Sequence, residues 1–255
     1  MQLIFMAPAA LAIVAGVSWS GLSDPAIAGE LHDAAKTGDV ESVRALLAAG
    51  ADADEPDLSG TALHLAAIKG DAAVAEALIF AGADIEAESD LAGARPLHAA
   101  AERGRTEVAQ MLLAHGAEVD ARDARARTPL LLAATAGDVE LVEVLLDHGA
   151  DPDARESVHD DVALHMAARS QRVEIVEQLL AAGADLDGRN AAGETPLFYA
   201  TAHCDLDIVA LLAANGGDLE TRNDAGESLA DVVTPARCRS EAEVEELFRL
   251  IAAAK

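Results

Sequence analysis

The residues with the most chemical potential in this chain are two cysteines and eight histidines. Cys204 and Cys238 lie far apart in the sequence, and His203 directly precedes the first of them. A redox or metal-linked accessory role would use these side chains, but no C-x-x-C pair is present to activate a thiolate. No H-E-x-x-H motif, zinc-type Cys/His spacing, Ser/His/Asp arrangement or phosphate-binding glycine loop stands out. We therefore expect no catalytic residues, no metal site and no cofactor, and we keep the Cys204/Cys238 role as an alternative.

Carboxylates are the third group that could do chemistry. The chain has 45 acidic and 18 basic residues, which give a formal net charge of −27. Such a surface repels nucleic acid and anionic lipid headgroups, because binding to phosphates requires net positive charge. We expect no nucleic-acid partner. The electrostatic complement is another protein with a basic surface, although acidity alone also serves solubility.

The N-terminal segment, from Met1 to Ser23, carries no charged side chain, and its central part from Leu3 to Val17 is an apolar run. The small-x-small sequence Ala26-Ile27-Ala28 follows, so the segment 1–28 resembles a secretory signal peptide cleaved after Ala28, although the basic n-region is missing. The alternative is an uncleaved membrane anchor or a membrane-tethered adaptor, against which Pro8, Gly16 and the lack of a basic stop-transfer cluster count. We expect an exported, periplasmic protein with no other membrane contact.

The elements that must position these side chains follow a repeat. One leucine recurs at nearly equal intervals, at Leu63, Leu97, Leu130, Leu164 and Leu197. A glycine follows each of these leucines at a constant distance, at Gly82, Gly116, Gly149, Gly183 and Gly216, whereas the distance from a glycine to the next leucine varies. A segment of fixed length must pack in the same way each time, and a segment of variable length is a surface loop.

The fixed segment has the periodicity of two short helices. In the unit that runs from Leu130 to Gly149, Leu130 and Ala133 share one helical face, and Val142 and Leu145 share another after the turn at Gly137. A proline precedes the leucine in three units, where it suits the first helical turn. The predicted unit is therefore a helix, a turn, a second helix and a closing glycine.

The motifs Thr61-Ala62-Leu63-His64-Leu65-Ala66-Ala67 and Arg95-Pro96-Leu97-His98-Ala99-Ala100-Ala101 resemble the ankyrin signature, as does the closing Gly183-Ala184-Asp185. The resemblance covers residues 30 to about 251 and implies an all-α ankyrin-repeat solenoid with projecting finger loops, in one domain over residues 29–255. The predicted units span residues 30–54, 60–87, 94–121, 127–154, 161–188 and 194–221, with a C-terminal cap at 226–255. It implies that the histidine after the repeated leucine is structural and links neighbouring units.

The repeat register also bears on the two cysteines. Cys204 lies in the turn of its unit where Gly137 lies in an earlier one, and Cys238 lies in the corresponding, enlarged turn of the last unit. Equivalent turns lie side by side in a stack, so in an exported protein the two residues suggest a disulfide that fixes the C-terminal cap. Two free thiols are the alternative.

The acidic residues concentrate in the variable loops. The first aspartate of each loop belongs to the Gly-Ala-Asp consensus and suits a turn, so it is structural. Residues beyond the consensus are the candidates for binding a partner. They are Glu55, Asp57, Glu88, Asp90, Asp123, Arg125, Glu156 and Asp160. With few aromatic anchors, we predict a monomeric scaffold that binds a protein through its acidic finger loops and its concave helix face.

Overall fold

The computed structural model describes residues 25–89, 92–234, 236 and 238–252. Within these ranges it contains thirteen α-helices and no strand, only two isolated bridges. This confirms the predicted all-α repeat solenoid. No helix in the described part is long and apolar enough to cross a membrane. Residues 1–24, which make up most of the predicted signal peptide, and Asp90 lie outside the described residues.

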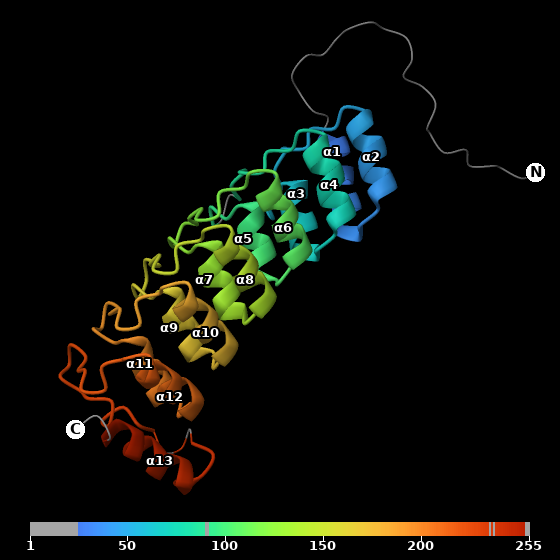
Figure 1. The fold of residues 1–255 in the computed structure, drawn as a ribbon. Coiled ribbons are helices and arrows are strands. Elements are labelled where there is room, and N and C mark those ends of the chain that lie inside the picture. The colour runs from blue at the N-terminus through green and yellow to red at the C-terminus, as the bar shows by residue number, and fades with distance from the viewer. Residues whose placement is uncertain (1–24, 90–91, 235, 237, 253–255) are drawn as a thin grey trace, which may run out of the picture.

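The helices form six pairs stacked in a single row, followed by one closing helix (Figure 1). The first helices of the pairs are α1 (Pro25–Thr37), α3 (Ala62–Lys69), α5 (Pro96–Glu102), α7 (Pro129–Ala136), α9 (Ala163–Arg169) and α11 (Pro196–Ala202). The second helices are α2 (Val40–Ala48), α4 (Ala72–Phe80), α6 (Thr106–Ala114), α8 (Val139–Asp147), α10 (Val173–Ala181) and α12 (Leu206–Ala214). The closing helix is α13 (Glu241–Ala252).

The turn inside each pair requires a residue with left-handed backbone conformation. The first four pairs use glycine, with φ between 60° and 80°, at Gly38, Gly70, Gly104 and Gly137. The fifth and sixth pairs use Gln171 (φ 56°) and Cys204 (φ 58°) in the same place. A side chain in this conformation costs about 1 kcal/mol relative to glycine.

Short polar side chains begin four of the six second helices. In each of them an aspartate carboxylate accepts a hydrogen bond from the backbone N–H three residues later, at 3.0 to 3.2 Å. The four residues are Asp39, Asp71, Asp138 and Asp205. Such a cap satisfies one of the four unpaired N–H groups at a helix start. Helices α6 and α10 follow Arg105 and Arg172, which make no side-chain cap.

The core is one continuous layer that runs through the stack. Successive first helices contact one another, and so do successive second helices. The first helices approach closely because their facing residues are alanine pairs with no exposed surface, at Ala66-Ala67, Ala100-Ala101, Ala133-Ala134 and Ala167-Ala168. Leucines fill the space between the two helix layers, as Leu63 and Leu78 do in the second unit. Because each unit buries its apolar face against its neighbours, the stack is stable only as an array.

The two ends differ from the internal units. Helix α1 starts at Pro25, ahead of the predicted first unit, so the predicted cleavage point after Ala28 falls within this helix. Among the residues of α1 whose side chains are described, Leu31 is the first buried one, and it lies after the predicted cleavage point. At the other end α13 packs on α12, and Leu247 is its one fully buried side chain among the described residues.

Candidate protein-interaction surface

The loops that join one helix pair to the next project from the same side of the stack (Figure 1). We call them fingers one to six, and they comprise residues 49–61, 81–95, 115–128, 148–162, 182–195 and 215–228. They carry most of the residues that the sequence nominated for partner binding. Their backbone and side-chain contacts decide which of those residues face solvent.

A run of carboxylates ties the fingers together. In each of the first five fingers, the second acidic residue accepts a hydrogen bond from the backbone N–H of the first acidic residue in the next finger, at 2.7 to 3.0 Å. We call this set the acidic ladder, and its members are Asp54, Asp84, Glu86, Glu118, Asp120, Asp151, Asp153, Asp185, Asp187 and Asp218. The second acidic residue of each pair is therefore as structural as the first.

The acidic ladder still presents charge to solvent. Seven of its members are exposed, namely Asp54, Asp84, Glu118, Asp151, Asp185, Asp187 and Asp218. An ionised carboxylate can accept several hydrogen bonds, so a backbone N–H bond does not use up the group. One edge of the stack thus carries a row of negative charges whose positions are fixed by the fold.

Two candidates from the sequence lie inside their fingers and are not available to a partner. Asp123 is 7 % exposed, and its carboxylate accepts bonds from the backbone N–H groups of Arg125 and Arg127 and from the Arg127 guanidinium. Glu156 is 5 % exposed and accepts bonds from Val158, His159 and Asp161 N–H groups. Burial alone would raise the pKa of each carboxyl, but these bonds lower both pKa values.

Glu88, Asp160 and Arg125 reach the surface of their fingers. Glu88 is 62 % exposed and lies 3.8 Å from Arg95, a side chain that also binds the ladder residues Glu86 and Glu118. Hydrogen bonding to Glu118, together with the charges of both ladder carboxylates, raises the Arg95 pKa in spite of partial burial. Asp160 is 49 % exposed and pairs with Arg155 at 2.7 Å. Arg125 is exposed.

The first finger combines two half-buried acids with an apolar tip. Asp57 lies 3.4 Å from Lys36 of α1, and Glu55 lies in the same groove. Leu58, at the tip, is 85 % exposed. Val158 at the tip of finger four is also exposed, by 57 %. These two apolar tips had no signal in the repeat pattern, because they lie in the part of the unit that varies in length.

The repeated histidines are framework residues, as the resemblance implied. Nε2 of His64 lies 2.8 Å from the carbonyl oxygen of Ala94 in the next unit, while its Nδ1 accepts the N–H of Thr61. His98 and His165 make the same pair of contacts. Burial lowers the pKa of all three histidines, so the neutral ring that joins two units is favoured.

A family model described as "Ankyrin repeats (3 copies)" matches residues 31–123, 73–156 and 130–223. These overlapping matches run from residue 31 to residue 223, which is more than half of the chain. The chain belongs to the ankyrin-repeat family.

The crystal structure of the human ASB11 ankyrin repeat domain is similar to this ankyrin-repeat protein, with a TM-score of 0.76 and 28 % sequence identity. The alignment covers 86 % of this chain and 96 % of the ASB11 chain. No curated protein sequence matches the chain. Ankyrin repeats generally mediate contacts between proteins, and the fold is typical of interaction scaffolds that are not enzymes.

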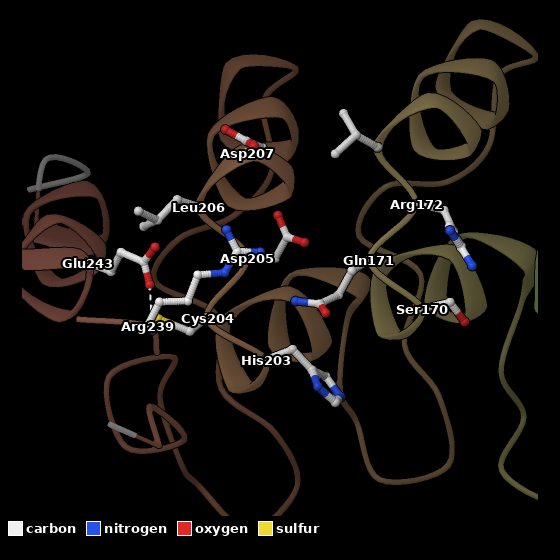
Figure 2. A pocket seen from close by; sticks show the side chains of 11 residues that line it. Ser170, Gln171, Arg172, His203, Cys204, Asp205, Leu206, Asp207, Arg239 and Glu243 are labelled. Carbon is white, nitrogen blue, oxygen red and sulfur yellow. Dashed lines mark hydrogen bonds between the residues drawn. The ribbon is translucent and has the colours of Figure 1, made fainter. Parts of the chain in front are cut away.

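The alternative site near the cysteines is an open groove of about 880 Å³ at the turns of the last two helix pairs and the cap (Figure 2). Cys204 and Cys238 are joined in a disulfide, with their Cα atoms 5.2 Å apart. Since the described part of the chain has no free thiol, a thiolate nucleophile or ligand is absent while this bond is intact. The groove is lined by charges of both signs, including Arg172, Asp205 and Arg239. The geometry gives no support to the redox or metal-linked alternative.

Proposed function

We propose that this ankyrin-repeat protein is a monomeric scaffold that binds a protein with a basic surface through its fingers and the first helices beside them. The observation that carries the proposal is the acidic ladder, because it fixes a row of charges along one edge of the stack. A preorganised row of like charges attracts a complementary partner over about a Debye length and raises the association rate.

The exposed residues around the ladder add specificity to this attraction. Glu88 and Asp160 extend the negative surface beyond the ladder, and their side chains are 62 % and 49 % exposed. Leu58 and Val158 supply apolar contacts at two finger tips. A partner with basic residues flanking an apolar segment would match this arrangement better than a uniformly basic one.

The test distinguishes the effect of losing charge in the fingers from the effect of lowering the net charge elsewhere. One variant carries Glu55→Gln, Asp57→Asn, Glu88→Gln and Asp160→Asn, which remove four charges from the fingers. The matched control removes four charges from exposed positions on the second helices, with Glu76→Gln, Glu107→Gln, Glu143→Gln and Glu177→Gln. Both proteins have the same formal net charge, but the finger variant also removes the ion pairs with Lys36, Arg95 and Arg155.

The partner is first recovered by crosslinking the native protein in the cell-envelope fraction, identified by mass spectrometry and purified. Its association rate is then measured by surface plasmon resonance at about 50 and 500 mM salt. We expect the finger variant to associate at least tenfold more slowly at low salt, and the control to stay within about threefold of wild type. Equal slowing of both variants, or binding indifferent to salt, would refute the role of the fingers.

We also propose that the protein is exported and works in the periplasm. The uncharged N-terminal stretch supports this, and so does the pairing of its two cysteines, since disulfides persist in oxidising compartments. Mass spectrometry of the mature N-terminus tests the proposal. Trp19 is the chain's one tryptophan, so a cleaved protein must lack tryptophan emission, whereas an anchored protein retains it.

A further inference from the structure

The fourth finger brings together three metal-ligating side chains that no sequence motif connected. One ligand atom each of Glu156, His159 and Asp161 lies within 4.8 Å of the other two. The two carboxylates are buried and the imidazole is exposed. We propose that these three side chains bind a divalent first-row transition-metal ion of the zinc type.

A comparison with the third finger shows what the fourth one lacks. In the third finger the backbone N–H of Asp123 bonds to the carbonyl of Arg127, and the Arg127 guanidinium neutralises the buried Asp123 carboxylate at 2.7 Å. The fourth finger makes the same backbone pair between Glu156 and Asp161, at 3.1 Å. Asp161 of the fourth finger thus takes the place of Arg127 in the third finger, so a second carboxylate stands where the third finger has a cation.

The later fingers avoid this accumulation of charge. The position of Glu156 is taken by Asn190 in finger five and by Asn223 in finger six, and a neutral amide can lie beside a carboxylate without repulsion. Asn223 donates directly to the Glu227 carboxylate at 2.8 Å. Among the described fingers that share this backbone pair, the fourth alone buries two acids at the paired positions.

Among the described residues, no lysine or arginine pairs with the second buried acid, Asp161. Asp161 has no exposed surface, and its hydrogen-bond donors are the neutral Asn190 amide at 2.9 Å and the Tyr199 hydroxyl at 3.2 Å. No described lysine or arginine makes an ion pair with it, and Arg155 of the same finger pairs with Asp160. Buried charges are normally paired or coordinate a metal, because their desolvation is otherwise expensive. A divalent cation would supply the missing positive charge.

The surrounding contacts orient the two carboxylates in the way that supporting residues orient metal ligands. Three backbone N–H groups hold Glu156 and keep it ionised, and its Oε2 accepts just one of them, from Val158 at 2.7 Å. Oε2 therefore retains a lone pair for a metal. Burial and the charge of Asp161 raise the pKa of Tyr199, so the phenol stays protonated and donates to Asp161.

The ligand set and the spacing suit zinc-type ions. One imidazole nitrogen and two carboxylate oxygens form a mixed ligand set that binds zinc and its neighbours, whereas calcium and magnesium take oxygen ligands alone. Tetrahedral bonds of about 2.0–2.1 Å place ligand atoms roughly 3.3 Å apart. Nδ1 of His159 lies 3.7 Å from Oε1 of Glu156, the neighbour of the proposed ligand atom Oε2, and the His159 side chain is 64 % exposed. Water would complete the fourth position.

The site is tested by isothermal titration calorimetry, in which Zn²⁺ is added to the full-length, metal-free protein. We expect one tight equivalent in the wild-type protein and at least a tenfold loss of affinity in His159→Ala. His148→Ala is the matched control, because His148 is also exposed and lies in the same finger, and it should bind like wild type. His159 is on the surface, so its replacement leaves the core intact.

Magnetic resonance of the histidine rings supplies a second readout in the unmodified protein. Stoichiometric Zn²⁺ should shift the ring signals of His159 and leave those of His148 unchanged. If wild type and His159→Ala bind Zn²⁺ equally, or if both rings shift alike, the ion binds only the acidic surface and the proposal is wrong. This outcome would leave the partner-binding proposal untouched, since the finger variant described above retains all three ligands.

Discussion

Removing the Cys204–Cys238 disulfide is expected to loosen the C-terminal cap and little else. The perturbation is the double variant Cys204→Ala/Cys238→Ala. The two cysteines are separated by 34 positions, and the loop that their bond closes contains α12 and the sixth finger. In the chain-entropy treatment, closure of a loop of this length stabilises the folded state by about 3.8 kcal/mol. This is an upper limit for the cap alone, because α12 stays folded when only α13 opens.

The size of this contribution matters because α13 has few other anchors. Leu247 is its one fully buried side chain in the described part, and complete burial of a leucine stabilises by roughly 1.5–3 kcal/mol. Val244, Leu250 and Ile251 are half-buried. At its upper limit of about 3.8 kcal/mol, the disulfide contributes more than the burial of Leu247, the largest single packing contact of the cap. Since each unit of a solenoid contacts only its neighbours, the loss stays local.

Hydrogen exchange measured by mass spectrometry resolves the cap from the rest of the stack. We expect α13 amides to exchange on the order of 10²-fold faster in the double variant, with α5 to α8 unchanged within about twofold. Cys204→Gly/Cys238→Ala separates the bond from the strained turn, because glycine relieves the left-handed φ of 58° at position 204. If α13 exchanges at the wild-type rate in both variants, the bond does not hold the cap and the reasoning fails.

Three further predictions concern the framework. Gln171→Gly should stabilise the chain by about 1 kcal/mol in urea unfolding, because residue 171 adopts φ 56°; a loss of stability would contradict the assigned strain. Asp138→Ala should destabilise by about 1 kcal/mol through loss of the α8 cap, and Asp138→Asn, which still accepts the bond, should recover most of it. Folding lowers the pKa values of His64, His98 and His165. Below about pH 6.5 the unfolded chain therefore binds more protons than the folded chain. The urea midpoint should therefore fall as pH drops from 7.5 to 5, and His98→Leu should flatten that slope.

The fold was predictable because its information is local and repeated. The constant distance from the repeated leucine to the closing glycine identified the helix pairs, and the structure places both helices of each internal unit inside that segment or within one position of it. In the C-terminal cap, Ser240 begins α13 by accepting the Glu243 N–H at 3.2 Å, and the Glu243 carboxylate accepts the N–H of Arg239.

The finger residues were predictable in type but not in role. Asp123 and Glu156 exceeded the consensus in the sequence, which suggested a surface role, yet both fold back to hold the backbone of their own finger. The signal that could have revealed this is their common position, since Asn190 and Asn223 occupy it in later fingers. A side chain that accepts several N–H groups of its own loop belongs to the loop rather than to a partner.

Sequence alone thus determined the number of units, because helix periodicity and capping act over a few residues, and the resemblance to the ankyrin family implied the framework role of the histidines. Tertiary structure decided which carboxylates form the acidic ladder, because those contacts join residues of different units, and which carboxylates are buried within their own fingers. It alone placed Glu156, His159 and Asp161 around one point. Their spacing along the chain carries no such instruction, because the path of a finger depends on the units stacked on either side of it.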